Sequence, residues 1–138
     1  MSYAGDLTPE ETYRLLQDRP DATLVDVRTQ AEWNYVGLPD LSAVGRSVIT
    51  VEWVSFPGGV RNEAFLEQLA AAGVTAQTPL AFLCRSGVRS QGAANLATEA
   101  GYGQAYNVLG GFEGDLDQTG HRSSTSGWKH VGLPWRQS

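Results

Sequence analysis

Residues 79–101 constrain the fold of this chain more than any other segment. An apolar run, Leu80-Ala81-Phe82-Leu83, is typical of a short buried strand, and the only cysteine of the chain, Cys84, follows it directly. Residues 85–90 are polar and charged and include a glycine, which is typical of a tight turn. An alanine-rich helical pattern over residues 90–100 comes next and ends at a glycine. The segment therefore predicts a strand, a short loop and a helix in direct succession.

The position of Cys84 predicts a reactive thiol. A lone cysteine is ordinarily a small buried hydrophobic residue. A thiol at the carboxyl end of a strand and just before a helix, however, faces unpaired backbone N–H groups and the positive end of the helix dipole. Both favour the thiolate, which is the nucleophilic form, and Arg85 and Arg89 add positive charge to the same loop. We therefore expect Cys84 to be catalytic.

The rest of the chain alternates between patterns typical of helices and patterns typical of strands. A threonine, a proline and two glutamates at residues 8–11 are typical of a capped helix start, and this helix should end before Pro20. The remaining patterns predict helices at residues 29–33, 62–73 and 90–100, strands at 23–27, 48–54, 79–83 and 105–109, and a loop at 56–59. Such alternation predicts an α/β fold, with a mostly parallel central sheet and helices on both faces in three layers.

Composition limits the domain organisation and the partners. The chain has 138 residues, of which 41% are hydrophobic, so residues 1–138 should form a single domain with one core. The net charge is −5, and the nine arginines among the ten basic residues are scattered, which argues against nucleic-acid or membrane-surface binding. The sequence starts without a secretory signal pattern. Because a single cysteine cannot form an internal disulfide, we expect a cytoplasmic protein.

The C-terminal part is predicted to be an accessory segment without a metal or cofactor site. Residues 115–127 are polar and predict a surface loop, and residues 128–138 form a tail whose aromatic side chains should dock on the body. Two histidines and one cysteine do not supply a convincing metal cluster, and an acidic stretch that begins at Asp115 lacks the acid that a calcium loop needs at its twelfth position. No glycine-rich nucleotide-binding motif is present either, so we expect no cofactor.

Three segments together resemble the rhodanese-like domains. Residues 24–28, Leu-Val-Asp-Val-Arg, resemble the first signature of that family, and a Glu-Trp pair follows at residues 32–33. Residues 82–90, Phe-Leu-Cys-Arg-Ser-Gly-Val-Arg-Ser, resemble its active-site loop, and residues 106–112 resemble the strand and glycine pair that come after it. The segments occur in the family order within residues 7–113. One departure is Val36-Gly37-Leu38-Pro39-Asp40-Leu41, which lacks the histidine of the family's usual Gly-His-Ile-Pro-Gly-Ala stretch.

The resemblance implies a sulfurtransferase of the thiosulfate sulfurtransferase type. Cys84 would take a sulfane sulfur from an anionic donor as a persulfide, and a thiol, cyanide or a partner protein would remove it. A persulfide is compact, and a nest of backbone N–H groups can surround its sulfur. The residues that we expect to bind the donor and the sulfur are Arg85, Ser86, Gly87, Val88, Arg89 and Ser90.

Several of these side chains have a structural alternative. Arg85 and Arg89 can instead pair with acids such as Asp26 or Glu32, and the Ser90 hydroxyl suits a helix cap better than a substrate ligand. The hydroxyl of Ser86 is expected to add a hydrogen bond to the sulfur.

Two other functions compete with sulfur transfer. A cysteine-dependent phosphatase or arsenate reductase usually has five residues between its cysteine and an arginine, but here position 90 is Ser and the arginine comes at position 89. The shorter loop suits a single sulfur better than a tetrahedral oxyanion. The other alternative is a rhodanese-like interaction module without catalysis, although this chain keeps the nucleophile.

Overall fold

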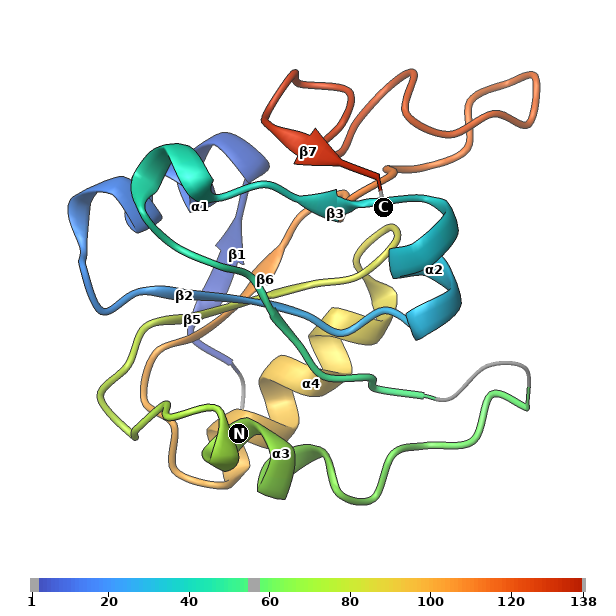
Figure 1. Ribbon diagram of the computed structural model, residues 1–138. Coiled ribbons are helices and arrows are strands. Elements are labelled where there is room, and N and C mark those ends of the chain that lie inside the picture. Colours follow the sequence, from blue (N-terminus) through green and yellow to red (C-terminus); the bar gives the residue numbers. More distant parts are fainter. Residues whose placement is uncertain (1–2, 55–57, 138) are drawn as a thin grey trace.

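The computed structural model describes residues 3–54 and 58–137, and its centre is a parallel sheet. Five of the described strands form this sheet in the order β1-β6-β5-β2-β4 (Figure 1). Their bounds are β1 (Gly5–Leu7), β2 (Thr23–Asp26), β4 (Ile49–Thr50), β5 (Leu80–Leu83) and β6 (Ala105–Val108). Strand β5 lies in the middle and pairs in parallel with β2 on one side and β6 on the other. The predicted α/β class and parallel sheet are confirmed.

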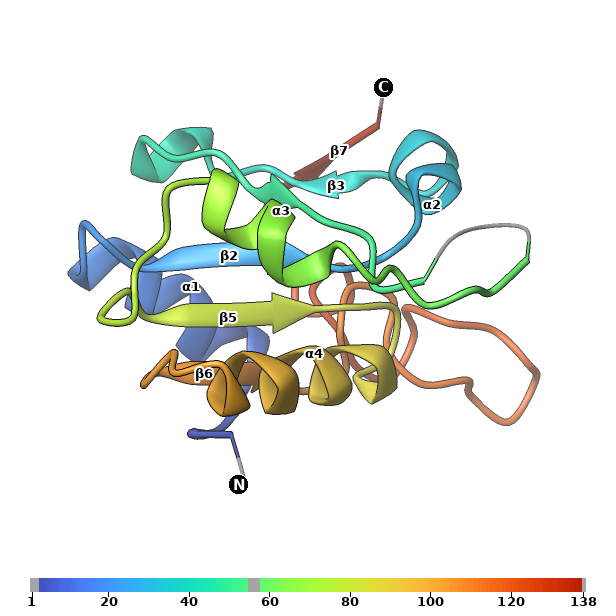
Figure 2. The same ribbon diagram turned by 90° about the horizontal axis from the view of Figure 1, so that it is seen from below.

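Helices and loops cover both faces of the sheet, as Figures 1 and 2 show. Helices α3 (Phe65–Ala71) and α4 (Val88–Glu99) lie on one face, and α1 (Pro9–Asp18) lies on the other. The alternation of side chains along β5 explains both layers, because Leu80 and Phe82 belong to the cluster under α3 and α4 while Ala81 and Leu83 belong to the cluster on the α1 side. A strand that is buried on both faces has an uninterrupted apolar sequence.

Local signals explain where the first two helices begin. At the start of α1, the Thr8 hydroxyl accepts a hydrogen bond from the Glu11 backbone N–H at 3.1 Å, and the Glu11 carboxylate accepts one from the Thr8 N–H at 2.9 Å. The predicted capping box is thus confirmed. Helix α2 (Gln30–Tyr35) has the same arrangement between Thr29 and Glu32, which fixes Glu32 in the first turn of that helix.

The structure corrects several predicted bounds. The strand predicted at 48–54 is only β4, followed by an isolated bridge between Val54 and Arg61. Part of the loop predicted at 56–59 lies outside the described residues. The structure adds β1 at one edge, a short turn of 3-10 helix at Ser42–Val44, and an antiparallel pair of β3 (Leu38–Pro39) with β7 (Trp135–Arg136). Strands of two or three residues carry too little periodicity to be found from sequence.

The C-terminal tail docks on the body, as predicted. Trp128 is fully buried in the cluster on the α1 side, where its ring meets that of Tyr13 edge-on with centroids 5.9 Å apart. Its backbone N–H donates to the Gly111 carbonyl at 2.8 Å, and β7 adds the pairing with β3. The tail is therefore tied to the end of the sheet where β6 finishes.

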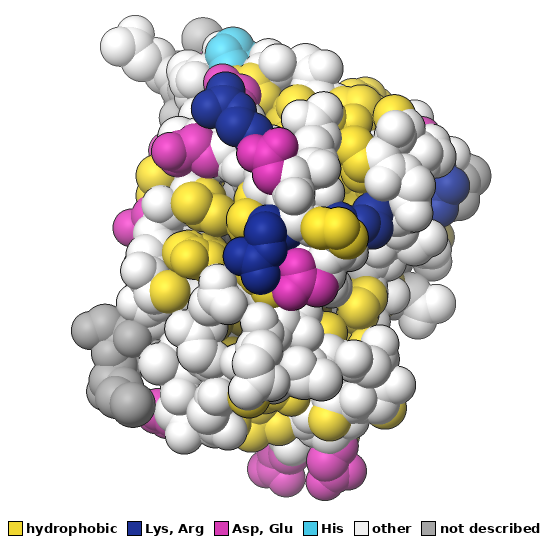
Figure 3. Space-filling model, turned by 90° about the vertical axis from the view of Figure 1, so that its left-hand side faces the viewer, with side chains coloured by type: hydrophobic (Ala, Val, Ile, Leu, Met, Phe, Trp, Pro, Cys, Tyr) yellow, Lys and Arg dark blue, Asp and Glu magenta, His cyan; other side chains and the backbone are white. Residues whose placement is uncertain are grey.

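The surface of the described chain mixes the two signs of charge. On the face shown in Figure 3, Lys and Arg side chains lie beside Asp and Glu side chains. An exposed ion pair joins Arg19 to Asp21, at 3.2 Å. Within the described residues, no helix is both long and apolar enough to span a bilayer.

A buried ion pair links the end of β2 to its surroundings. The carboxylate of Asp26 accepts hydrogen bonds from Nε and Nη2 of Arg28 at 2.9 and 2.7 Å, and both side chains are fully buried. Arg28 also donates to the Gly37 carbonyl at 2.6 Å, and its guanidinium lies 4.2 Å from the centre of the Phe112 ring. These two residues therefore have a scaffold role, because the pair joins three segments of the chain.

We predict that Asp26→Ala lowers the free energy of unfolding by about 3–5 kcal/mol, because it leaves the Arg28 charge buried without its partner. Denaturant titration followed by circular dichroism measures this. The matched control is Asp21→Ala, which breaks the exposed pair with Arg19 and should change the stability by less than about 1 kcal/mol. Equal effects of the two substitutions would contradict the role of the buried pair.

Candidate active site

Cys84 directly follows the central strand, at the carboxyl edge of the sheet. In open parallel sheets, this edge is where ligands bind. The backbone of Cys84 is held from the β6 side, because its carbonyl accepts a hydrogen bond from the Phe112 N–H at 2.8 Å. From the β2 side, the Val27 N–H donates to the Leu83 carbonyl at 2.8 Å. The loops after three neighbouring strands therefore meet around this one cysteine.

Two glycines permit the tight path of the loop after Cys84. Gly87 has φ of 115°, a conformation that other residues rarely adopt, and it immediately precedes α4. Gly111, which belongs to the glycine pair after β6, has φ of 61°, and a Cβ atom there would lie 2.4 Å from the Cys84 carbonyl oxygen. Gly111 is thus required so that the segment after β6 can press against the backbone of the cysteine loop.

The sulfur of Cys84 has polar contacts from this loop and from α4. The Gly87 N–H donates to Sγ at 3.0 Å, and the hydroxyl oxygen of Ser90 lies 3.2 Å from Sγ. The Ser90 hydroxyl itself donates to Oδ1 of Asn107, whose amide nitrogen donates to the Asp6 carboxylate at 3.0 Å. The Ser90 hydroxyl has one proton, and it donates this proton to Asn107. In this arrangement, the thiol of Cys84 is therefore the donor in its contact with Ser90.

Asn107 and Asp6 are site residues that the sequence interpretation missed. They come from β6 and β1, far from Cys84 in the chain, and only the strand order brings them near it. The one available signal was a polar residue, Asn107, within the otherwise apolar strand at 105–109. Asn107 is 1% exposed, so its hydrogen bonds inside the protein are required to offset the loss of water.

One expectation about the loop is wrong. Ser90 is not a helix cap, because α4 already begins at Val88 and the Ser90 hydroxyl faces the sulfur. Among the described residues, the thiol sulfur is contacted by the Ser90 hydroxyl and by one backbone N–H, that of Gly87. The hydrogen bond from Ser86 and the ring of N–H donors around a persulfide sulfur stay predictions.

The sulfur does not lie in an open bowl, because Cys84 is only 1% exposed. The side chain packs in the cluster under α3 and α4. Only the loop residues that follow it reach the surface, with Arg85 and Val88 exposed. A reagent can therefore reach the sulfur only when this short loop moves.

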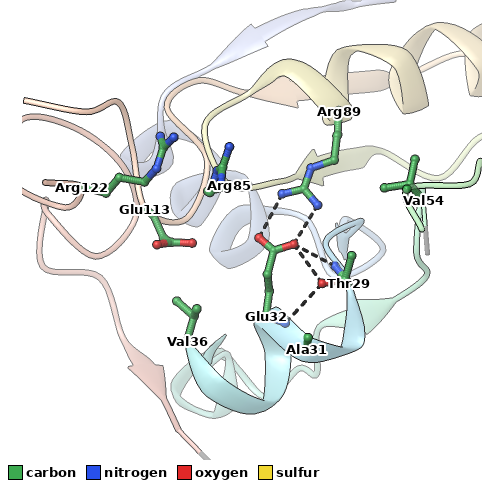
Figure 4. Close-up of a pocket in the computed structure, with 10 residues that line it drawn as sticks. Thr29, Ala31, Glu32, Val36, Val54, Arg85, Arg89, Glu113 and Arg122 are labelled. Atoms are coloured by element: carbon green, nitrogen blue, oxygen red, sulfur yellow. Dashed lines mark hydrogen bonds and ion pairs between the residues drawn. The ribbon is translucent and has the colours of Figure 1, made fainter. Parts of the chain in front are cut away.

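A pocket of about 520 Å³ lies beside the cysteine loop (Figure 4). Its charged lining comes from α2, from the loop and start of α4, and from the segment after β6. The charged lining residues are Glu32, Arg85, Arg89, Glu113 and Arg122. Val36, which belongs to the stretch without the family histidine, lines the pocket as well. The predicted loop arginines thus share one pocket with Glu113, at the end of the segment that resembles the family, and with Arg122, which lies beyond that segment.

Arg89 is neutralised by Glu32. Two hydrogen bonds of 2.8 and 3.0 Å join its guanidinium to that carboxylate, as Figure 4 shows. Burial alone would raise the pKa of the Glu32 carboxyl, but the hydrogen bonds and charge of Arg89 outweigh burial, so this pKa lies below its ordinary value. The structural alternative for Arg89 is therefore the one observed, and its contact with a donor stays a prediction.

Comparison with known proteins identifies the family. The chain matches the family of the STR4 middle domain over residues 5–138. It is 37% identical to the uncharacterized protein RC0915 of Rickettsia conorii, over 91% of this chain and 92% of that protein. It is 29% identical to the chloroplastic protein THYLAKOID RHODANESE-LIKE of Oryza sativa subsp. indica, over 95% of this chain and 25% of that protein. The chain belongs to the rhodanese-like family.

Solved structures agree with this rhodanese-like assignment. The crystal structure of Rv0390 from M. tuberculosis matches with a TM-score of 0.91 and 55% identity, over 99% of this chain and all of that one. The polysulfide-sulfur transferase homodimer of Wolinella succinogenes matches with a TM-score of 0.63 and 25% identity, over 96% of this chain and 78% of that one. Distant relatives of this rhodanese-like chain are thus sulfurtransferases.

The described residues of this rhodanese-like domain hold no group of three or more His, Cys, Asp or Glu side chains that could bind a metal ion.

We predict that the covered position of Cys84 makes its reactivity depend on reagent size. Methyl methanethiosulfonate needs a smaller opening of the loop than 5,5′-dithiobis(2-nitrobenzoate). The folded state should therefore slow modification of Cys84 by the bulky reagent by a larger factor than modification by the small one. The measurement is the modification rate of native protein relative to protein unfolded in urea, for each reagent. Equal slowing of both reagents would show that loop opening does not limit access.

Proposed function

We propose that this rhodanese-like domain is a sulfurtransferase that carries sulfane sulfur as a persulfide on Cys84. The observation that supports it best is the cysteine itself, which follows the central strand and is contacted by the Gly87 N–H and the Ser90 hydroxyl. These groups can stabilise negative charge on one sulfur atom, which is what both the thiolate and the persulfide require. We place the reaction in the cytoplasm, where a lone thiol stays reduced.

With thiosulfate as the donor, the transfer is a simple displacement. The Cys84 thiolate attacks the outer, sulfane sulfur, a new S–S bond forms, and the old S–S bond breaks with its electron pair leaving on sulfite. A thiol, cyanide or the thiol of a partner protein then attacks the persulfide and takes the outer sulfur, which returns Cys84 as a thiolate. No external oxidant or reductant is needed, because sulfane sulfur moves from one sulfur atom to another acceptor.

The residues around Cys84 have distinct roles in this reaction. Once the thiol has lost its proton, the Ser90 hydroxyl can rotate from Asn107 to donate to the sulfur, next to the Gly87 N–H. The exposed Arg85 attracts an anionic donor to the pocket beside the loop. Ser86 and Val88 shape the loop by their backbone.

The arrangement argues against phosphatase chemistry. A phosphate cradle needs a free arginine that grips the oxyanion, but Arg89 is bound to Glu32 at two points. Position 90, where such an arginine would stand, holds the serine that contacts the sulfur. An aryl phosphate should accordingly not be hydrolysed, and hydrolysis that Cys84→Ser abolishes would favour the phosphatase alternative.

We predict that incubation with thiosulfate, followed by removal of excess donor, adds the mass of one sulfur atom to the chain. Cyanide should then remove the added mass as thiocyanate. Intact-protein mass spectrometry measures both steps. Cys84→Ser is the matched control and should gain nothing and turn nothing over, because the chain has no other thiol. An unmodified wild-type chain under these conditions would favour the non-catalytic interaction module.

A further inference from the structure

The pocket beside the cysteine loop contains a negative charge that an inorganic donor does not need. Among its described acidic lining residues, Glu32 is already paired with Arg89, and no ion pair joins Glu113 to another described side chain. In Figure 4 the Glu113 carboxylate points into the pocket, on the side where Arg85 and Arg122 also stand. Thiosulfate carries two negative charges and no positive one, so Glu113 would repel it.

The segment that carries Arg122 is built to hold it in place. At its base, Gly114 and Gly127 touch backbone to backbone, and a Cβ atom on Gly127 would lie 2.6 Å from the Gly114 nitrogen. The guanidinium of Arg122 donates to the Gly114 carbonyl at 2.8 Å, which leaves further N–H groups for a ligand.

Asp117 organises the outer part of the same segment. Its carboxylate accepts hydrogen bonds from the Ser124 hydroxyl, the His121 backbone N–H and Thr119. These bonds hold the pKa of Asp117 far below its usual range, so the carboxylate stays charged and bonded at neutral pH. Arg122 is thus presented on an ordered turn rather than on a loose loop.

We propose that the sulfur donor for this site is the persulfide of a small α-amino acid thiol, of the cysteine persulfide class. This proposal rests on the proposed function and specifies its donor. The donor's carboxylate would bind Arg122 and Arg85, and its ammonium group would bind Glu113. Apart from the Arg89–Glu32 pair, the charged lining of the pocket consists of two guanidinium groups and one carboxylate. Their charges are complementary to those of a donor that carries a carboxylate, a persulfide anion and one ammonium group. A pocket of about 520 Å³ has room for such a molecule, whereas thiosulfate would leave most of this pocket empty.

The transfer step keeps the same balance of atoms and electrons as with thiosulfate. The Cys84 thiolate attacks the outer sulfur of the donor, the S–S bond of the donor breaks, and its electron pair leaves with the amino-acid thiolate. The Cys84 persulfide forms in the same step. The leaving amino-acid thiolate takes the place that sulfite has in the thiosulfate reaction.

The test compares three donors that differ by one group each. These are the persulfides of cysteine, of 3-mercaptopropionate, which lacks the ammonium group, and of cysteamine, which lacks the carboxylate. Each is prepared from its disulfide and sulfide, and the second-order rate of Cys84 persulfide formation is measured by quenched-flow mass spectrometry. We expect the wild-type chain to favour cysteine persulfide over 3-mercaptopropionate persulfide by about tenfold or more, as for a hydrogen-bonded charge pair.

Variants separate the two contacts. Glu113→Gln should remove the preference for the ammonium group and leave the rate with 3-mercaptopropionate persulfide unchanged or higher. Arg122→Gln should slow both carboxylate donors but not cysteamine persulfide. Arg14→Ala, on the exposed side of α1, is the control for a lost surface charge and should change no rate. Thermal unfolding shows whether each variant keeps its fold, and Glu113→Gln with Arg122→Gln provide two independent readouts.

The outcomes distinguish this proposal from the proposed function. If Cys84 is loaded by all three donors and by thiosulfate at similar rates, and Glu113→Gln changes none of them, the amino-acid donor is overturned while the sulfurtransferase stands. If no donor loads Cys84, the proposed function itself fails.

Discussion

The parallel pairing of β5 with strands on both sides decides where chemistry can occur in this chain. Because β2, β5 and β6 all run in the same direction, the loops that follow them meet at one edge of the sheet. Cys84 is the first residue beyond the middle strand, and hydrogen bonds to both sides fix its backbone. The close approach of Gly111 to the Cys84 carbonyl leaves no room for a side chain there. The sulfur of Cys84 is thus positioned by the sheet itself rather than by a flexible surface loop.

Burial of the sulfur limits which reagents can reach Cys84, and it requires the loop to open before the proposed reaction. A covered thiol that is contacted by one N–H and one hydroxyl is protected from bulky electrophiles, yet a persulfide adds only one atom to it. The neighbouring Ser90–Asn107–Asp6 network keeps the hydroxyl oriented in the resting state. Recognition of the donor then falls to the pocket outside the loop, where Arg85, Glu113 and Arg122 stand.

Much of this arrangement follows from local sequence signals, and the remainder depends on tertiary contacts. The capping box of α1 and the apolar run of β5 are local patterns. The alternation of helical and strand patterns predicted the fold class, and the apolar run predicted the position of Cys84 at the end of a strand. The roles of Asn107, Glu113 and Arg122 depend on which strands are neighbours and on how the tail folds back, which no local pattern reports. The burial of Cys84 depends on tertiary contacts in the same way, since it belongs to a cluster whose members come from the sheet, α3 and α4.

The central claim, that Cys84 accepts a single sulfur atom and holds it, is tested most directly by the release of sulfite without an acceptor. Saturating thiosulfate is mixed with the protein, and sulfite is counted against the amount of chain. We expect a burst of one sulfite per chain that then stops, because no acceptor is present and the chain has no second cysteine to discharge the persulfide. Absence of a burst, or an equal burst from Cys84→Ser, would contradict it.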